Sequence, residues 1–158
     1  LKVAAMEGLW ETTRGAPLLL FALPDPKTES NRFEIGVPKL ASLILTHDWD
    51  GEVIGLKSAP PENRPPVMQV FWSFRVMVGI GFAMLCLAWA GALFLLRRSL
   101  ERQTWLLRLL VWAGPSGFVA TLAGWYVAEI GRQPWVVYGI LRTADAVSPV
   151  PAGSTPLR

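Results

Sequence analysis

The chain has 158 residues, enough for one domain, with a formal net charge of +3 and a hydrophobic fraction of 52%. Residues 1–68 carry most of the acidic groups and prolines, whereas residues 69–135 contain two long apolar runs. The positive charge comes largely from arginines that flank these runs, so it reports membrane topology, and no basic stripe points to nucleic acid. Cys86 is the only cysteine, which excludes an internal disulfide and a thiolate metal cluster.

The first 68 residues are expected to form a loop-rich extracytoplasmic segment. Residues 1–10 place apolar side chains at helical spacing. Residues 18–23 are apolar but lie between prolines and are too short to span a membrane, so they predict a packed loop or a short strand-like piece. A short helix is expected over 37–46, and the four prolines of 58–66 predict a semi-rigid connector into the membrane.

Two uncharged runs predict two transmembrane helices. The first run, 76–96, has 21 residues, and the second, 109–128, has 20. About 20 helical residues cross a hydrocarbon core that is roughly 30 Å thick. We therefore expect an all-α integral membrane protein in which helices over about 69–97 and 107–132 form a hairpin around a short loop at 98–106.

The loop between the two runs is strongly positive, because it contains four arginines against Glu101 alone. These arginines are Arg97, Arg98, Arg102 and Arg108. The positive-inside rule places this loop in the cytoplasm. Both outer ends, 1–68 and 133–158, are therefore expected on the opposite, extracytoplasmic side of the membrane.

The second helix should end shortly before a proline. Pro134 disfavours helical geometry at Gln133, so we expect the helix to end near Arg132. The following residues, 135–141, are expected to form an interfacial piece. The Pro, Ser and Gly content of 148–158 predicts a disordered tail.

Glu129 lies at the expected boundary between lipid and water. A charged residue costs about 2.5–3.5 kcal/mol at the bilayer centre and less near the interface, so it normally has a partner or a function. Trp125, Glu129 and Arg132 are spaced i, i+4 and i+7, which places them on one helical face. Spacing alone leaves two interpretations open: an intrahelical Glu–Arg pair capped by interfacial aromatic residues, and a working site.

Met77 lies near the start of the first span, beside Arg75 and at about the expected depth of Glu129. A methionine in an apolar helix is usually a core filler, and Met84 on the same helix is read in that way. Methionine thioether is also one of the few neutral axial ligands that haem iron accepts. A neighbouring arginine can pair with haem propionates.

His47 and the acidic residues after it do not form a recognisable metal motif. With no second histidine or cysteine, His47 is interpreted as a solvated loop residue rather than a zinc or di-iron ligand. Asp48, Asp50 and Glu52 lack the rest of a calcium-binding loop, so they are interpreted as a solvated charge run. Glycine-rich phosphate loops and nucleophile elbows are absent from the sequence.

Three separate blocks share their order and spacing with one known family. They are residues 2–7 with 10–12 (KVAAME, WET), residues 71–79 (FWSFRVMVG) and residues 124–135 (GWYVAEIGRQPW). Together they resemble the large, haem-bearing subunit I of cytochrome bd-type quinol oxidases. The resemblance covers nearly the whole chain, and GRQPW is its most specific element.

The resemblance implies haem-binding roles for five residues. Met77 matches the methionine that binds the iron of the low-spin haem b, and Arg75 matches an arginine that stabilises this haem in its reduced form. Glu129 matches the carboxylate at the iron of the high-spin haem b. Arg132 matches an arginine near the haem pair, and Trp125 matches an aromatic residue between haems that serves electron transfer.

Two further residues match the periplasmic quinol-oxidising loop of the family, the Q-loop. These are Lys2 and Glu7, where a carboxylate that accepts a quinol proton is chemically sensible. The short connection after 53–56 resembles the cyanide-insensitive-type branch. His47 matches neither of the family's haem histidines, which lie upstream, and the last transmembrane helix of the family is not present.

The resemblance therefore implies a C-terminal-half fragment of a larger helical bundle, the haem-bearing subunit of a quinol:oxygen oxidoreductase. Its parent is expected to use two b haems and a third haem, d or b, to oxidise ubiquinol or menaquinol and to reduce oxygen to water. The expected partners are oxidase subunit II, a small accessory subunit and membrane lipid, with no nucleic acid. The fragment alone is expected to be inactive.

A second class of function is a non-catalytic two-span membrane anchor or interaction module. An anchor has no need for Met77, Glu129 and Arg132 at one depth, and this feature discriminates between the two classes. A soluble all-α protein is disfavoured by two uncharged runs of about 20 residues.

Overall fold

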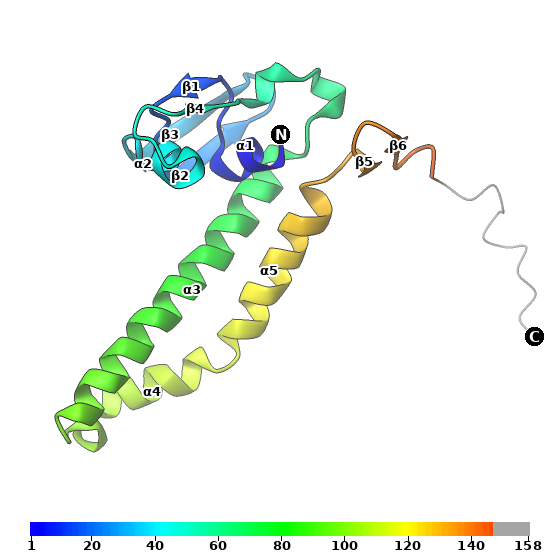
Figure 1. Ribbon diagram of the computed structural model, residues 1–158. Coiled ribbons are helices and arrows are strands. Elements are labelled where there is room, and N and C mark those ends of the chain that lie inside the picture. Colours follow the sequence, from blue (N-terminus) through cyan, green and yellow to red (C-terminus); the bar gives the residue numbers. More distant parts are fainter. Residues whose placement is uncertain (147–158) are drawn as a thin grey trace, which may run out of the picture.

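The computed structural model describes residues 1–146. A small head formed by residues 1–66 lies at one end of a long helical hairpin, and the second arm of the hairpin returns to the head (Figure 1). The two outer ends of the predicted spans therefore lie at the same end of the molecule. The tail predicted over 148–158 lies outside the described residues.

The head contains strands as well as helices, so the all-α prediction holds only approximately. Strands β2 (Leu18–Asp25) and β3 (Ser30–Val37) form an antiparallel hairpin. Strands β1 (Thr13–Arg14) and β4 (Glu52–Val53) form a second, shorter pair. The side chains of β3 are almost all exposed, so the sequence carries no alternating apolar signal there, and pairing with β2 makes this segment a strand.

The turn between β2 and β3 is held by Asp25. Its Oδ1 atom accepts the backbone N–H of Lys27 at 3.0 Å, and its Oδ2 atom accepts a hydrogen bond from Arg32 at 3.1 Å. The Lys27 N–H is the main cause that holds the pKa of Asp25 below its usual value. An aspartate that bonds to the backbone two residues ahead is a common turn device.

Two short helices and two 3-10 turns complete the head. Helix α1 (Lys2–Glu7) and helix α2 (Leu40–Thr46) confirm the helices expected over 1–10 and 37–46. The connector to the membrane contains the turns η1 (Leu56–Ser58) and η2 (Pro61–Asn63). Proline fixes φ near the helical value, which suits the first position of η2.

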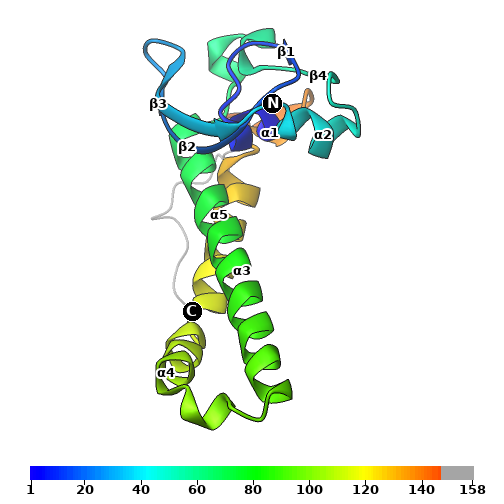
Figure 2. The same ribbon diagram turned by 90° about the vertical axis from the view of Figure 1, so that its left-hand side faces the viewer.

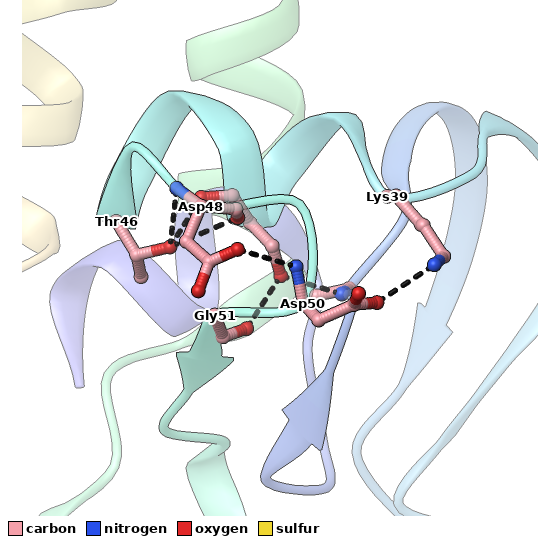
Figure 3. Close-up of polar contacts among 7 residues, drawn as sticks. Lys39, Thr46, Asp48, Asp50 and Gly51 are labelled. Atoms are coloured by element: carbon pink, nitrogen blue, oxygen red, sulfur yellow. Dashed lines mark hydrogen bonds and ion pairs between the residues drawn. The ribbon is translucent and has the colours of Figure 1, made fainter.

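The acidic turn after α2 is held by its own polar groups (Figure 3). Asp48 Oδ1 accepts the backbone N–H of Asp50 at 3.1 Å, and Asp50 Oδ1 accepts a hydrogen bond from Lys39 Nζ at 2.7 Å. These contacts give the two carboxylates a structural role on the surface, in agreement with their interpretation as a solvated charge run. His47 is exposed at the C-terminal cap of α2, as expected for a loop histidine.

Ser42 ties α2 to the chain on both sides of it. The fully buried hydroxyl accepts the backbone N–H of Ala16 at 2.7 Å and donates to the carbonyl of Gly51 at 2.8 Å. We expect Ser42→Ala to destabilise the head by about 1–3 kcal/mol, because two backbone groups lose a partner. Faster limited proteolysis near α2 would measure this effect, and Ser30→Ala, an exposed position, should leave the rate unchanged.

The hairpin consists of helix α3 (Val67–Leu96), the turn η3 (Leu100–Arg102), helix α4 (Thr104–Ala113) and helix α5 (Ser116–Ile130). A small β-hairpin follows, formed by β5 (Trp135–Val137) and β6 (Leu141–Arg142). The stretches Pro61–Leu96 and Thr104–Ile130 are both long and apolar enough to cross a membrane. The two predicted spans are thus found as helical stretches, with α3 two residues longer at its start than expected.

The second span is broken, which the sequence analysis did not predict. Helices α4 and α5 meet at Gly114 and Pro115, and the chain changes direction there (Figure 2). Proline has no N–H to donate to the preceding turn, and glycine weakens a helix further. The Ser116 hydroxyl donates to the carbonyl of Ala113 at 2.5 Å, which satisfies one backbone acceptor at the break. Helix α5 ends at Ile130, two residues before the expected position.

The head docks on the first turns of α3 through a fully buried phenylalanine. Phe71 packs with Leu19 and Ala22 of β2. Gly8, which caps α1 with a positive φ of 66°, also faces this ring, because a Cβ atom there would lie 3.2 Å from Phe71 Cδ2. Only glycine adopts this conformation without strain and leaves room for the ring. The close contact holds α1 beside α3.

Candidate functional site

A buried ion pair joins α1 to α3. Arg75 Nη2 donates to Glu7 Oε2 at 2.9 Å, and the two side chains are only 12% and 7% exposed. The residues are 68 positions apart in the chain. The sequence analysis assigned Glu7 to quinol oxidation and Arg75 to the low-spin haem, and it did not expect them to contact one another.

Arg75 is held from three further directions. Its Nε atom donates to the backbone carbonyl of Leu19 in β2 at 2.6 Å. Its guanidinium carbon lies 4.5 Å from the ring centre of Phe71 and 5.3 Å from that of Phe74. A planar guanidinium suits this combination of ion pair and aromatic contact, which a lysine cannot reproduce. Arg75 therefore fixes the head on the helix that carries Met77.

Met77 faces α5. A Cβ atom built on Gly124 would lie 2.9 Å from Met77 Sδ and 3.8 Å from Met77 Cγ. The thioether therefore lies directly over the backbone of Gly124, in the contact between α3 and α5. This glycine belongs to the third block of the resemblance, but the sequence analysis gave it no role.

Glu129 of α5 forms an ion pair with Arg132, which lies two residues beyond the end of the helix. Arg132 Nη2 donates to Glu129 Oε2, and both side chains are about half-exposed. Trp125 is 61% exposed on the same helix, with its ring edge against Tyr126. The pair is thus present at the end of α5, and most of the Trp125 side chain is exposed.

The side chain of Lys2 extends from α1 to the end of α5 and does not follow that of Glu7. A Cβ atom on Gly131 would lie 3.1 Å from Lys2 Cγ and Cε, so the lysine stem crosses the end of α5. Lys2 also lines a cavity of about 320 Å³ together with Arg132 and Trp135. The two residues that the resemblance assigns to the Q-loop therefore leave α1 in different directions, Glu7 to α3 and Lys2 to α5.

Trp135 is a further candidate that the sequence analysis passed over. Its indole Nε1 atom is buried, and it has no hydrogen-bond partner among residues 1–146. The guanidinium carbon of Arg142 lies 5.1 Å from the centre of the Trp135 ring. Trp135 also lines the cavity that Lys2 lines. Lys2 and Arg132, which line the same cavity, carry positive charges that can bind an anionic group such as a carboxylate. The place of Trp135 in GRQPW was the only sequence signal.

The comparisons with known proteins decide the family. The sequence profile of the family described as cytochrome bd terminal oxidase subunit I matches residues 1–157. The chain belongs to this family. The resemblance carried by the three blocks is thereby confirmed.

Known members of the cytochrome bd subunit I family are similar over nearly the whole chain. The cytochrome bd ubiquinol oxidase subunit 1 of Bacillus subtilis (strain 168) is 41% identical over 98% of this chain and 35% of its own length. The cytochrome bd-II ubiquinol oxidase subunit 1 of Escherichia coli (strain K12) is 28% identical over 96% of this chain and 42% of its own length. The chain thus spans little more than a third of these relatives.

The fold agrees with a solved structure of the same family. The bd oxidase from Geobacillus thermodenitrificans matches with a TM-score of 0.77 and 35% identity, over 91% of this chain and 33% of that chain. The head and the broken hairpin therefore form part of a larger subunit. Many apolar side chains of the hairpin, such as Trp89, Trp112 and Phe118, are exposed. A large exposed apolar surface marks a contact with a membrane or with another protein.

Proposed function

We propose that the chain is part of the haem-bearing subunit of a quinol oxidase that reduces oxygen to water. The observation that carries this proposal is the ion pair between Glu7 and Arg75, which joins the proposed quinol loop to the helix of the proposed haem ligand Met77. A buried ion pair costs desolvation and is weak evidence for stability alone. A two-span membrane anchor gains nothing from such a pair.

The side-chain donors fit haem. Met77 offers a neutral thioether, a donor that haem iron accepts, and Glu129 would offer a carboxylate. Lys2 and Arg132, which line one cavity with Trp135, would be able to pair with a haem propionate. When bound, haem supplies the one-electron and oxygen chemistry that side chains lack.

We assign the residues to the cofactors as the resemblance implies. Met77 would hold the low-spin haem b with Arg75 beside it, and Glu129 would hold the high-spin haem b with Arg132 nearby. Trp125 would lie between haems. The third haem, d or b, and the histidine ligands would belong to the rest of the subunit.

In this proposal Glu7 accepts a proton from quinol. Its Oε2 atom is held by Arg75, whereas its Oε1 atom accepts no hydrogen bond from residues 1–146. One oxygen thus orients the carboxylate, and the other can take the proton of a quinol hydroxyl as oxidation proceeds. Lys2, which also belongs to the proposed quinol loop, would complete the link from this loop to the end of α5.

The orientation in the membrane is part of the same proposal. The four arginines around η3 favour the cytoplasmic side for the turn between α3 and α4. The head and residues 133–146 would then face the periplasm of a bacterial inner membrane, where ubiquinol or menaquinol delivers its protons. Oxidase subunit II, a small accessory subunit and lipid would cover the exposed apolar surface of the hairpin.

Replacing Glu7 by glutamine tests the quinol assignment. In the complete oxidase, Glu7→Gln keeps a carbonyl oxygen for Arg75 but removes the proton acceptor. We expect the rate of quinol oxidation to fall by on the order of 100-fold or more, the lower range for general base catalysis, with unchanged haem spectra. Stopped-flow kinetics with reduced quinol would measure the rate.

Glu11→Gln is the matched control, because Glu11 lies four residues away on the surface and pairs only with Lys57 at 2.5 Å. This variant should keep the native rate. Native quinol kinetics in Glu7→Gln would remove Glu7 from the reaction.

A further inference from the structure

Gly124 of α5 faces the side chain of the proposed haem ligand Met77 on α3. A Cβ atom on Gly124 would meet Met77 Sδ at 2.9 Å, whereas ordinary contacts of a Cβ atom begin at 3.4 Å. An added methyl group would therefore displace the sulfur by about 0.5 Å, the difference between 3.4 and 2.9 Å. Apart from its own helix, Met77 is the only residue among 1–146 with an atom within 4 Å of this position.

Other glycines of the two spans do not share this requirement. A Cβ atom on Gly79, Gly81 or Gly117 would meet nothing within 4 Å among the described residues. Ala123 and Val127 of the same helix are buried, and Val127 packs in a cluster with Val67 and Val70 of α3. Small residues at a helix contact in a membrane let the backbones approach closely. At Gly124, the distance between α5 and α3 thus determines how much space the Met77 side chain has.

We propose that Gly124 is a positioning residue for the low-spin haem, because it sets where the Met77 thioether lies. This inference rests on the proposed function. A free methionine has three rotatable bonds and absorbs a new methyl group by turning away. A sulfur held by a metal cannot turn away without changing the length or angle of its bond to the metal.

The same contact relates the two proposed ligand positions to one another. Met77 lies on α3, and Glu129 follows Gly124 by five residues on α5. At Gly124, the helix that carries Glu129 therefore lies against the sulfur of Met77. A larger residue here changes the metal environment of Met77 first, since the thioether is the atom that it meets.

Gly124→Ala in the complete oxidase tests this inference by spectroscopy. We expect a redox titration to show at least a tenfold change in the ratio of reduced to oxidised low-spin haem at a fixed potential. For one electron this change equals a shift of about 59 mV in the midpoint potential of that haem. Loss of its absorbance band is the other expected outcome. The amount of high-spin haem should stay at the native level. Gly117→Ala, the same change on the same helix, should leave both haems as in the native enzyme.

The Met77→Leu background separates positioning from general packing. There, Gly124→Ala should have no additional effect on spectrum or assembly, because leucine binds no metal and can turn away from the new methyl group. A native low-spin spectrum and potential in Gly124→Ala, or an assembly defect of equal size in both backgrounds, overturns the inference alone. A native low-spin band in Met77→Leu itself overturns the proposed haem assignment and the inference together.

Discussion

Replacing Met77 by leucine in the complete oxidase is expected to remove the low-spin haem b absorbance while the protein still inserts into the membrane. Leucine has a similar volume and fills the same space over Gly124, so packing should cost less than about 1.5 kcal/mol. Leucine cannot bind iron, however, because it has no sulfur lone pair. Reduced-minus-oxidised difference spectra and haem extraction would measure the loss.

Met84→Leu is the matched control for this experiment. Met84 lies on the same helix, is 41% exposed and makes no contact with Gly124. The same chemical change at this position should leave the spectrum intact. An unchanged low-spin band in Met77→Leu would return Met77 to the role of a core filler.

Replacing Glu129 by glutamine is expected to lower oxygen reduction on the order of 100-fold or more and to change the high-spin haem spectrum. Even the removal of a residue that only supports a metal ligand typically lowers metal affinity or activity by about 10- to 100-fold. Glutamine can still accept a hydrogen bond from Arg132 but carries no charge for the iron. The two interpretations of the Glu–Arg pair therefore predict different results.

If the pair were only a helix-end contact, Glu129→Gln would change little, because half-exposed ion pairs contribute about 0–1 kcal/mol. Oxygen-electrode assays and spectra of the reduced enzyme would distinguish the two cases. Glu52→Gln, which affects a surface pair with Arg14, serves as the control and should keep full turnover. Normal turnover and a native high-spin spectrum in Glu129→Gln would leave the pair as a structural cap.

Local sequence was sufficient for the features that depend on neighbours in the chain. Uncharged length identified both spans, and the spacing of Glu129 and Arg132 allowed the pair that forms. A proline inside an apolar run, Pro115, was also a sequence signal for the break. The break was not predicted, because the run as a whole is long enough for one continuous helix. Strand β3 had no such signal, since its partner β2 defines it.

The assembly of the candidate site required the tertiary structure. Arg75 and Glu7 are separated by 68 residues, and their contact depends on how the head folds back on α3. Lys2 and Glu7 do not share one site, because their side chains extend from α1 to different helices. Spacing along the chain contains no information about such choices, because they follow from packing between distant elements.

The sequence by itself determined the two stretches that are long enough to span a membrane, the spacing that allows Glu129 and Arg132 to pair, and the family, because each rests on local spacing or on contiguous motifs. Only the tertiary structure decided that Glu7 neutralises Arg75, that Gly124 faces the sulfur of Met77, and that Lys2 joins Arg132 and Trp135 around one cavity. The physical reason is that burial and close packing bring together groups from distant parts of the chain, where ion pairs and short contacts are stronger and more specific than at the surface.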